Sequence, residues 1–124
     1  TTGGAANGDF DFIKPVVDNL GDLYMTTVNM RPGKAQTFGI VDGTPVFGLP
    51  GNPAAAYCGF ELIIRPALRK MQGYTCFAHP VVKARLSKDV KKNCIAVMPE
   101  GLESKAAGDE IDCIMLDIPE EIII

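Results

Sequence analysis

Three short polar turns hold most of the side chains and backbone donors in this sequence that suit anion binding. The first is the glycine-rich segment TTGGAANGD at residues 1–9, which is followed by a second carboxylate at Asp11. The second is RPGK at 31–34, where an arginine fork and a mobile lysine ammonium lie close together. The third is LPGNP at 49–53, between an apolar strand and a long helix pattern. Together these turns predict an anion site that can include a metal ion held by Asp9 and Asp11.

Each turn has a physical reason to bind an anion and also an ordinary explanation. Glycines let backbone N–H groups approach a ligand closely, and a helix N-terminus adds unpaired N–H groups and a positive dipole end. However, Gly-Gly pairs are usually simple turns, RPGK alone fits a solvated loop, and Asn-Pro is a common helix start. The sequence also lacks the phosphate-loop, G-x-S-x-G and H-E-x-x-H signatures. The coincidence of three turns, two cations and two carboxylates is what favours a site.

The elements that must position these turns follow from hydrophobic periodicity and turn signals. A helix is expected within 9–21, a strand at 23–30, and a hairpin of 37–41 with 44–49 around Asp42–Gly43. A longer helix is expected from Asn52 as N-cap to Gly73, with a kink or broken hydrogen-bond ladder at Pro66. Its expected apolar stripe comprises Tyr57, Phe60, Ile63, Ile64, Ala67, Leu68 and Met71.

The pattern changes after Gly73 to short apolar strands joined by turns. HPVVKARL, NCIAVMPEG and DEIDCIMLDI are the strand candidates. This change predicts an α/β unit at 1–73 and a small all-β unit at 74–124, with the boundary near 73–79.

Composition excludes several classes of function. The chain has 124 residues and a formal net charge of -3, so it provides no basic field for nucleic acid or an acidic membrane. No apolar run approaches the length of a membrane span. The four cysteines show no C-x-x-C pair and the single His79 stands alone, which predicts buried reduced thiols of a cytosolic protein rather than a zinc site.

The order of four motifs resembles the molybdopterin molybdotransferase family, which comprises the MoeA and gephyrin E-domain proteins. The motifs are GGAANGDFDF, RPGK, FGLPGNPAAA and RPALRKMQG, and they cover Gly3 to Gly73. The tail MPEGLESKAAGDEIDCIML looks like the end of the family's C-terminal β-barrel domain. The resemblance implies an α/β fold: the C-terminal half of a doubly wound molybdopterin-binding (MoCF-like) domain at 1–73, then part of a small β-barrel domain at 74–124.

The resemblance also implies an activity, which is insertion of molybdate into adenylylated molybdopterin, assisted by Mg²⁺, with release of AMP. Asp11 then matches an acidic residue near ligand and metal, with Asp9 as a second metal candidate, and Arg31 and Lys34 match the cations of the P-G-K turn. The residues implied to contact the pterin substrate are Gly3, Gly4, Gly8, Pro50, Gly51, Asn52 and Pro53.

This sequence departs from the family pattern at several positions. Alanines at Ala6 and Ala55 stand where the family commonly has serine, and Arg31 stands where it usually has lysine. The Arg31 side chain keeps the positive charge with a different geometry, whereas Ala6 and Ala55 favour an alternative, a catalytically degenerate relative that binds pterin or acts as a protein scaffold.

Two further expectations concern the extent of the chain and its assembly. The start at Thr1 predicts a chain that begins within a domain, and the adjacency of Lys92 and Asn93 predicts missing barrel residues. The resemblance implies a homodimer, while the cysteines indicate a cytoplasmic protein and the charge and hydropathy indicate no nucleic-acid or membrane partner.

Overall fold

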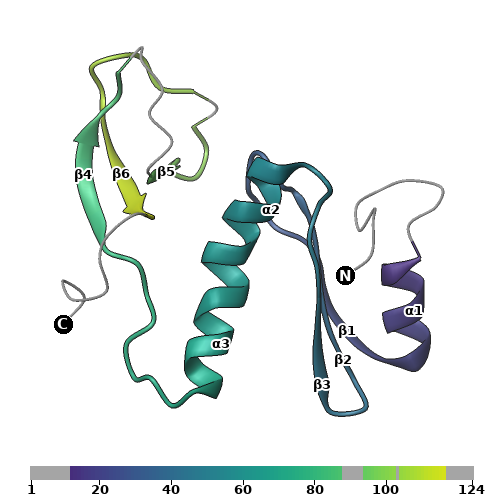
Figure 1. Ribbon diagram of the computed structural model, residues 1–124. Coiled ribbons are helices and arrows are strands. Elements are labelled where there is room, and N and C mark those ends of the chain that lie inside the picture. The colour runs from purple at the N-terminus through teal and green to yellow at the C-terminus, as the bar shows by residue number, and fades with distance from the viewer. Residues whose placement is uncertain (1–11, 88–93, 103, 117–124) are drawn as a thin grey trace. The chain divides into compact units, whose positions relative to one another are not determined.

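The chain folds into two compact units, residues 1–68 and 69–124, and the computed structural model describes residues 12–87, 94–102 and 104–116 (Figure 1). In chain order the elements are α1 (Ile13–Leu20), β1 (Gly21–Thr27), β2 (Ala35–Val41), β3 (Thr44–Gly48), α2 (Pro53–Gly59), the π-helical segment η1 (Phe60–Ile64), α3 (Arg65–Met71), β4 (Val81–Arg85), β5 (Cys94–Val97) and β6 (Glu110–Met115). Helices beside a first sheet, followed by a second small sheet, confirm the predicted α/β class. The proposed limit at residue 73 stays a prediction.

The first sheet is antiparallel, with strand order β1-β2-β3. The β2–β3 hairpin closes where Val41 pairs with Thr44 around the Asp42–Gly43 turn. Both turn residues have positive φ, 49° and 73°, as the Asp-Gly pair predicts for a two-residue hairpin loop. Phe38 of β2 stacks on Phe47 of β3 with ring centroids 4.9 Å apart, which adds an aromatic cross-strand pair to the hairpin.

The two faces of β2 are covered by different helices, because successive side chains on a strand point to opposite faces. A Cβ atom added at Gly39 would meet Val17 of α1, so the backbone of β2 lies directly against that helix. On the opposite face, a Cβ atom added at Gly59 of α2 would lie 2.5 Å from Oε1 of Gln36. The sheet therefore lies between α1 and α2, as Figure 1 also shows.

The buried face of α1 is narrower than the sequence pattern predicts. Val17 is buried, whereas Phe12, Val16 and Leu20 are exposed. Within the described residues, only one position of that helix is closed off by the sheet.

The helical run from α2 to α3 also differs from its predicted apolar stripe. Ala55 and Gly59 are buried, while Tyr57, Phe60, Leu68 and Met71 are exposed. Gly59 occupies the sheet-facing side of α2 because the side chains of Gln36 and Leu49 approach closely there. The stripe prediction was therefore wrong at both ends of this helix.

A π-helical segment interrupts the helix immediately before Pro66. The N–H of Arg65 donates to the carbonyl of Phe60, five residues earlier, instead of to that of Glu61. Proline has no N–H and its ring crowds the preceding turn, so a widened turn relieves the conflict without ending the helix. The predicted break of the ladder at Pro66 is confirmed. The helix ends at Met71, and Gly73 follows with φ 87°, as predicted for its stop.

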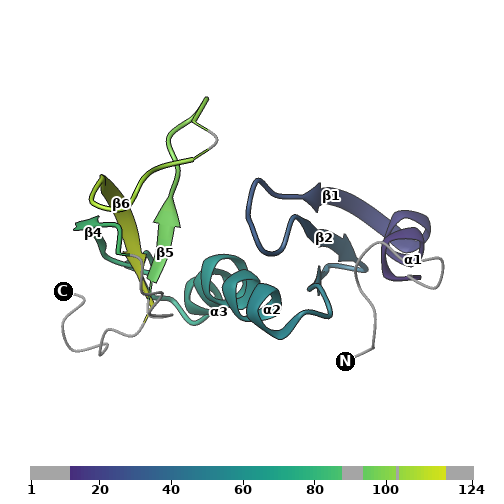
Figure 2. The same ribbon diagram turned by 90° about the horizontal axis from the view of Figure 1, so that it is seen from above.

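The second unit contains an antiparallel sheet with strand order β4-β6-β5, and Figure 2 shows β6 between its two neighbours. All three strands lie where the sequence predicts them. Among the described residues the sheet has these three strands and does not close into a barrel. Ile111 and Cys113 of β6 are buried and form its core.

The four cysteines are free thiols, but they are not all buried. Cys113 is buried and Cys76 is exposed, so the expectation of four buried thiols was wrong for Cys76. Burial raises the pKa of the Cys113 thiol above its usual value, and its hydrogen bond with Cys94 raises it further. Within the part of the chain that the structure describes, no helix has the length and apolar character that a membrane crossing needs.

Candidate functional site

The RPGK turn forms the tip of the connection between β1 and β2. The connection is closed by the N–H of Val28, which donates to the carbonyl of Lys34 at 2.8 Å. Gly33 has φ 109°, the left-handed region that the Pro-Gly pair predicts and that other residues rarely adopt. Arg31 and Lys34 flank this glycine, and both are exposed. The turn thus presents two cations on a short, closed loop.

The LPGNP turn starts α2 as the sequence predicts. The Asn52 side chain accepts a hydrogen bond from the N–H of Ala55 at 3.1 Å, and its carbonyl accepts one from Ala56 at 2.8 Å. Pro53 occupies the first helical position. The cap therefore uses one of the donors that were expected to be free for a ligand, and Pro53 has none. In this first turn, the N–H of Ala54 is the backbone donor that the Asn52 cap does not use.

The Asn52 cap leads to a first prediction. Asn52→Ala should lower the free energy of unfolding by about 0.5–2 kcal/mol, because the N–H of Ala55 loses its acceptor. Urea denaturation of the full-length protein measures this change. Asn52→Asp is the matched control, because aspartate caps a helix as well as asparagine does. Equal losses in both variants would show that the side-chain cap does not stabilise the helix.

The structure brings the second and third turns together within the first unit. A Cβ atom added at Gly33 would lie 3.3 Å from the Cβ of Ala55, so the tip of the cationic turn lies against the first turns of α2. Ala55 is 2% exposed, which places its methyl group inside this contact. These two turns therefore meet in the fold, and their part in a common ligand site stays a prediction. Ala55 lies in the packing between the turns, and no open ligand surface is formed at its side chain.

Gln36 is a member of the site that the sequence did not indicate. It is 1% exposed, and its Nε2 donates to the carbonyl of Gly33 at 3.0 Å. Its Oε1 has no hydrogen-bond partner among the described residues. An unpaired buried acceptor lowers the free energy of unfolding by about 1–3 kcal/mol, so burying the Oε1 of Gln36 destabilises the fold by that amount. Glutamine in a strand is usually solvent-exposed, and no sequence signal marks this one.

The electrostatics of the joined turns favour an anion. Neither Arg31 nor Lys34 forms an ion pair with another residue in the described ranges. The start of α2, with the positive end of its backbone dipoles, lies next to Gly33, the glycine between these two residues in the sequence. A Cβ atom added at Gly51 would meet no atom within 4 Å, so the backbone of the LPGNP turn can be approached closely.

The first predicted turn lies outside the described residues. This applies to Gly3, Gly4, Gly8, Asp9 and Asp11, and to Ala6. Their part in the site therefore stays a prediction. Across residues 12–87, 94–102 and 104–116, no group of three or more His, Cys, Asp or Glu side chains is placed to hold a metal ion.

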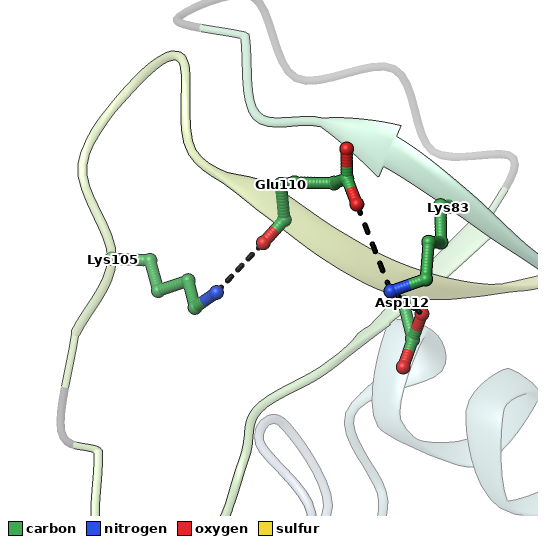
Figure 3. A network of polar contacts seen from close by, with 4 residues as sticks. All are labelled: Lys83, Lys105, Glu110 and Asp112. Atoms are coloured by element: carbon green, nitrogen blue, oxygen red, sulfur yellow. Dashed lines mark hydrogen bonds and ion pairs between the residues drawn. The ribbon is translucent and has the colours of Figure 1, made fainter.

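The charged side chains of the second unit form surface pairs. Lys83 Nζ lies 3.6 Å from Glu110 Oε1 and 3.8 Å from Asp112 Oδ1, and Lys105 Nζ donates to the Glu110 carbonyl at 2.7 Å (Figure 3). The side chains of Lys83, Glu110 and Asp112 are well exposed, and ion pairs of this kind contribute little to stability. The network links side chains on the surface of β4 and β6, and it does not form a ligand site.

Comparison with known proteins identifies the family. Residues 1–70, more than half of the chain, match the family described as "Probable molybdopterin binding domain". The chain belongs to this molybdopterin-binding family, and the resemblance deduced from the four motifs is confirmed.

Individual relatives agree with the family match. The chain is 39% identical over 93 residues to the molybdopterin molybdenumtransferase of Staphylococcus epidermidis RP62A, and 40% identical over 93 residues to that of Staphylococcus aureus COL. Each match covers 74% of this chain and 22% of the relative. A crystal structure of the molybdopterin biosynthesis MoeA protein from Pyrococcus horikosii superposes with a TM-score of 0.69 at 23% identity, covering 93% of this chain and 36% of that one. This last similarity supports the fold.

Proposed function

We propose that the protein takes part in molybdenum cofactor biosynthesis by inserting molybdate into adenylylated molybdopterin with release of AMP. The observation that carries the proposal is the contact between the RPGK turn and the start of α2, with Gly33 against Ala55. This contact brings Arg31 and Lys34 to the end of the helix where anions are favoured. The curated relatives are named as molybdopterin molybdenumtransferases, which supports the same reaction.

The chemistry proposed for these residues is binding and orientation. Arg31 supplies a planar fork for an oxyanion, and Lys34 supplies a point charge from the other side of Gly33. The backbone at Gly51 and the N–H of Ala54 are proposed to contact the pterin substrate, alongside Pro50, Asn52 and Pro53. Holding molybdate against the dithiolene of the pterin converts an encounter between two anions into a reaction within one complex.

Mg²⁺ belongs to this proposal through Asp9 and Asp11. Carboxylate oxygens are the ligands that magnesium prefers, usually in company with substrate phosphates. When bound, the ion would polarise the phosphate bond of the adenylyl group. The described residues add no further carboxylate cluster, so the roles argued above rest on cations and backbone donors alone.

The proposed reaction is tested with the full-length protein, adenylylated molybdopterin and molybdate. We expect AMP release that depends on molybdate. Absence of AMP with pterin binding retained would contradict the enzymatic proposal and would support the alternative of a binding or scaffolding relative. That alternative draws on Ala6 and Ala55, and the burial of Ala55 within the turn contact weakens the argument from that residue.

A second prediction concerns the two cations. Arg31→Ala and Lys34→Ala should each raise the molybdate concentration needed for half-maximal AMP release by about 10- to 100-fold, the value of one charge-assisted hydrogen bond. Lys14→Ala, on the exposed surface of α1, is the control for loss of a positive charge. An unchanged molybdate response in both site variants would remove the turn from the mechanism.

We further propose that the protein acts as a homodimer in the cytoplasm, with small-molecule substrates as its ligands. Its formal charge of -3 provides no general attraction for nucleic acid. Size-exclusion chromatography with light scattering of the full-length protein tests the dimer.

A further inference from the structure

We propose that Gln36 is a positioning residue that holds the cationic turn of residues 31–34 in register with the start of α2. The inference rests on the proposed function, because it assigns the geometry of that site to an amide that need not touch the substrate. Three observations on the Gln36 side chain carry it.

The first observation is where the Gln36 amide donates. Its Nε2 donates to the carbonyl of Gly33 at 3.0 Å. In the sequence, Gly33 lies between Arg31 and Lys34. The hydrogen bond therefore fixes the peptide unit that both cations flank. Gly33 has φ 109°, a backbone conformation that residues other than glycine rarely adopt, and the hydrogen bond attaches to the carbonyl of this residue.

The second observation is how closely α2 encloses the same amide. A Cβ atom at Gly59 would lie 2.5 Å from Oε1 and 2.8 Å from Nε2 of Gln36, and 2.8 Å from Cδ2 of Leu49. A Cβ atom at Gly33 would lie 3.0 Å from the same Nε2. The Gln36 amide thus lies between Gly33 in the turn and Gly59 in the helix. A shift of the turn or of the helix would therefore displace the amide.

The third observation is the unpaired Oε1. An apolar side chain of similar size would fill this place without leaving a buried acceptor unsatisfied. Gln36 is 1% exposed, so water cannot supply the missing hydrogen bond at the surface. A residue that serves packing alone would not need this amide, whereas a residue that must grip the Gly33 carbonyl does.

The test compares Gln36→Met with a matched control, Thr37→Val, in the full-length protein. Methionine keeps the length and burial of Gln36 but cannot donate to Gly33. Thr37 is the adjacent buried position of β2, on the opposite face of the strand. Hydrogen–deuterium exchange of residues 28–36 is measured together with the molybdate concentration for half-maximal AMP release. Thermal unfolding of each variant is recorded as well.

For Gln36→Met we expect local exchange in residues 28–36 about three- to tenfold faster, the value of one hydrogen bond, and a comparable rise in the half-maximal molybdate concentration. The maximal rate and the unfolding temperature should stay within the range of Thr37→Val. Gln36→Asn, which keeps the amide but is one methylene shorter, should behave like Gln36→Met.

Two results would overturn the inference. One is exchange and molybdate response equal to those of the unchanged protein. The other is faster exchange spread evenly over β1, β2 and α2 with a lower unfolding temperature, which would assign Gln36 a merely structural role. If the unchanged protein releases no AMP, the proposed function fails by itself. The exchange experiment still decides whether Gln36 holds the turn.

Discussion

Gly39→Ala is expected to destabilise the first unit by about 3 kcal/mol or more, a large part of the stability of a typical domain. A Cβ atom at position 39 would overlap Cγ1 of Val17 and lie 2.7 Å from the carbonyl oxygen of Asp22. The Val17 side chain can shift, but the Asp22 carbonyl belongs to the backbone of the paired strand β1. Accommodation therefore requires β1 and β2 to separate.

Urea denaturation and hydrogen exchange across β1 and β2 measure the effect of Gly39→Ala. Gly51→Ala is the control, because a Cβ atom there meets nothing within 4 Å, and its free energy of unfolding should change by less than about 0.5 kcal/mol. Adding Val17→Ala to Gly39→Ala should restore only part of the loss, since the carbonyl contact persists. A Gly39→Ala protein as stable as the Gly51→Ala control would mean that α1 and β1 do not pack against β2 as described.

Gly59→Ala is also expected to destabilise the first unit. Alanine favours a helix over glycine by about 1 kcal/mol, so an unconstrained position would gain stability. Here the new methyl group would lie 2.5 Å from Oε1 of Gln36 and 2.8 Å from Cδ2 of Leu49. Both contacts are with side-chain ends, but the amide of Gln36 is enclosed and bonded to Gly33. We expect a net loss of about 1–3 kcal/mol and displacement of the RPGK turn.

A double-mutant cycle with Gln36→Ala tests the origin of this loss. If the methyl group at position 59 acts by displacing the amide, Gln36→Ala makes room for it. The two changes should then couple by about 1 kcal/mol or more in the free energy of unfolding. Additive effects, within about 0.5 kcal/mol, would show that Gly59→Ala acts through Leu49 or the helix backbone instead.

Local sequence signals predicted the elements that present the site. Asp42–Gly43 fixes a two-residue hairpin by its φ preferences, and Asn52–Pro53 starts a helix by capping and a preset φ. These signals act over a few residues, so a single sequence contains them in full. The RPGK and LPGNP turns were likewise predicted as turns from local signals, and their contact at Gly33 and Ala55 is a finding of the structure.

The interior contacts of the site could not be predicted in the same way. The burial of Gln36 depends on the missing side chains of Gly33 and Gly59, which the fold brings together from different elements. The apolar stripe of the long helix was wrong because small residues face the sheet and because the π-helical segment alters the period after Gly59. No local pattern encodes either the close approach or the altered period. The glycine-rich turn with Asp11 lies outside the described residues and stays a prediction.

The π-helical segment changes the direction in which all later side chains of this helix point. A turn that closes five residues apart is equivalent to one residue inserted into an α-helix, and it rotates every later side chain by about 100° around the axis. The helix therefore carries two angular frames, one before Phe60 and one after Ile64. Before the π-helical segment, Ala55 keeps its place against Gly33 and Gly59 keeps its place against Gln36, whatever residues follow it. Loss of one residue within 60–64 would restore a single frame and turn the later half of the helix, while the site at its beginning stays in place.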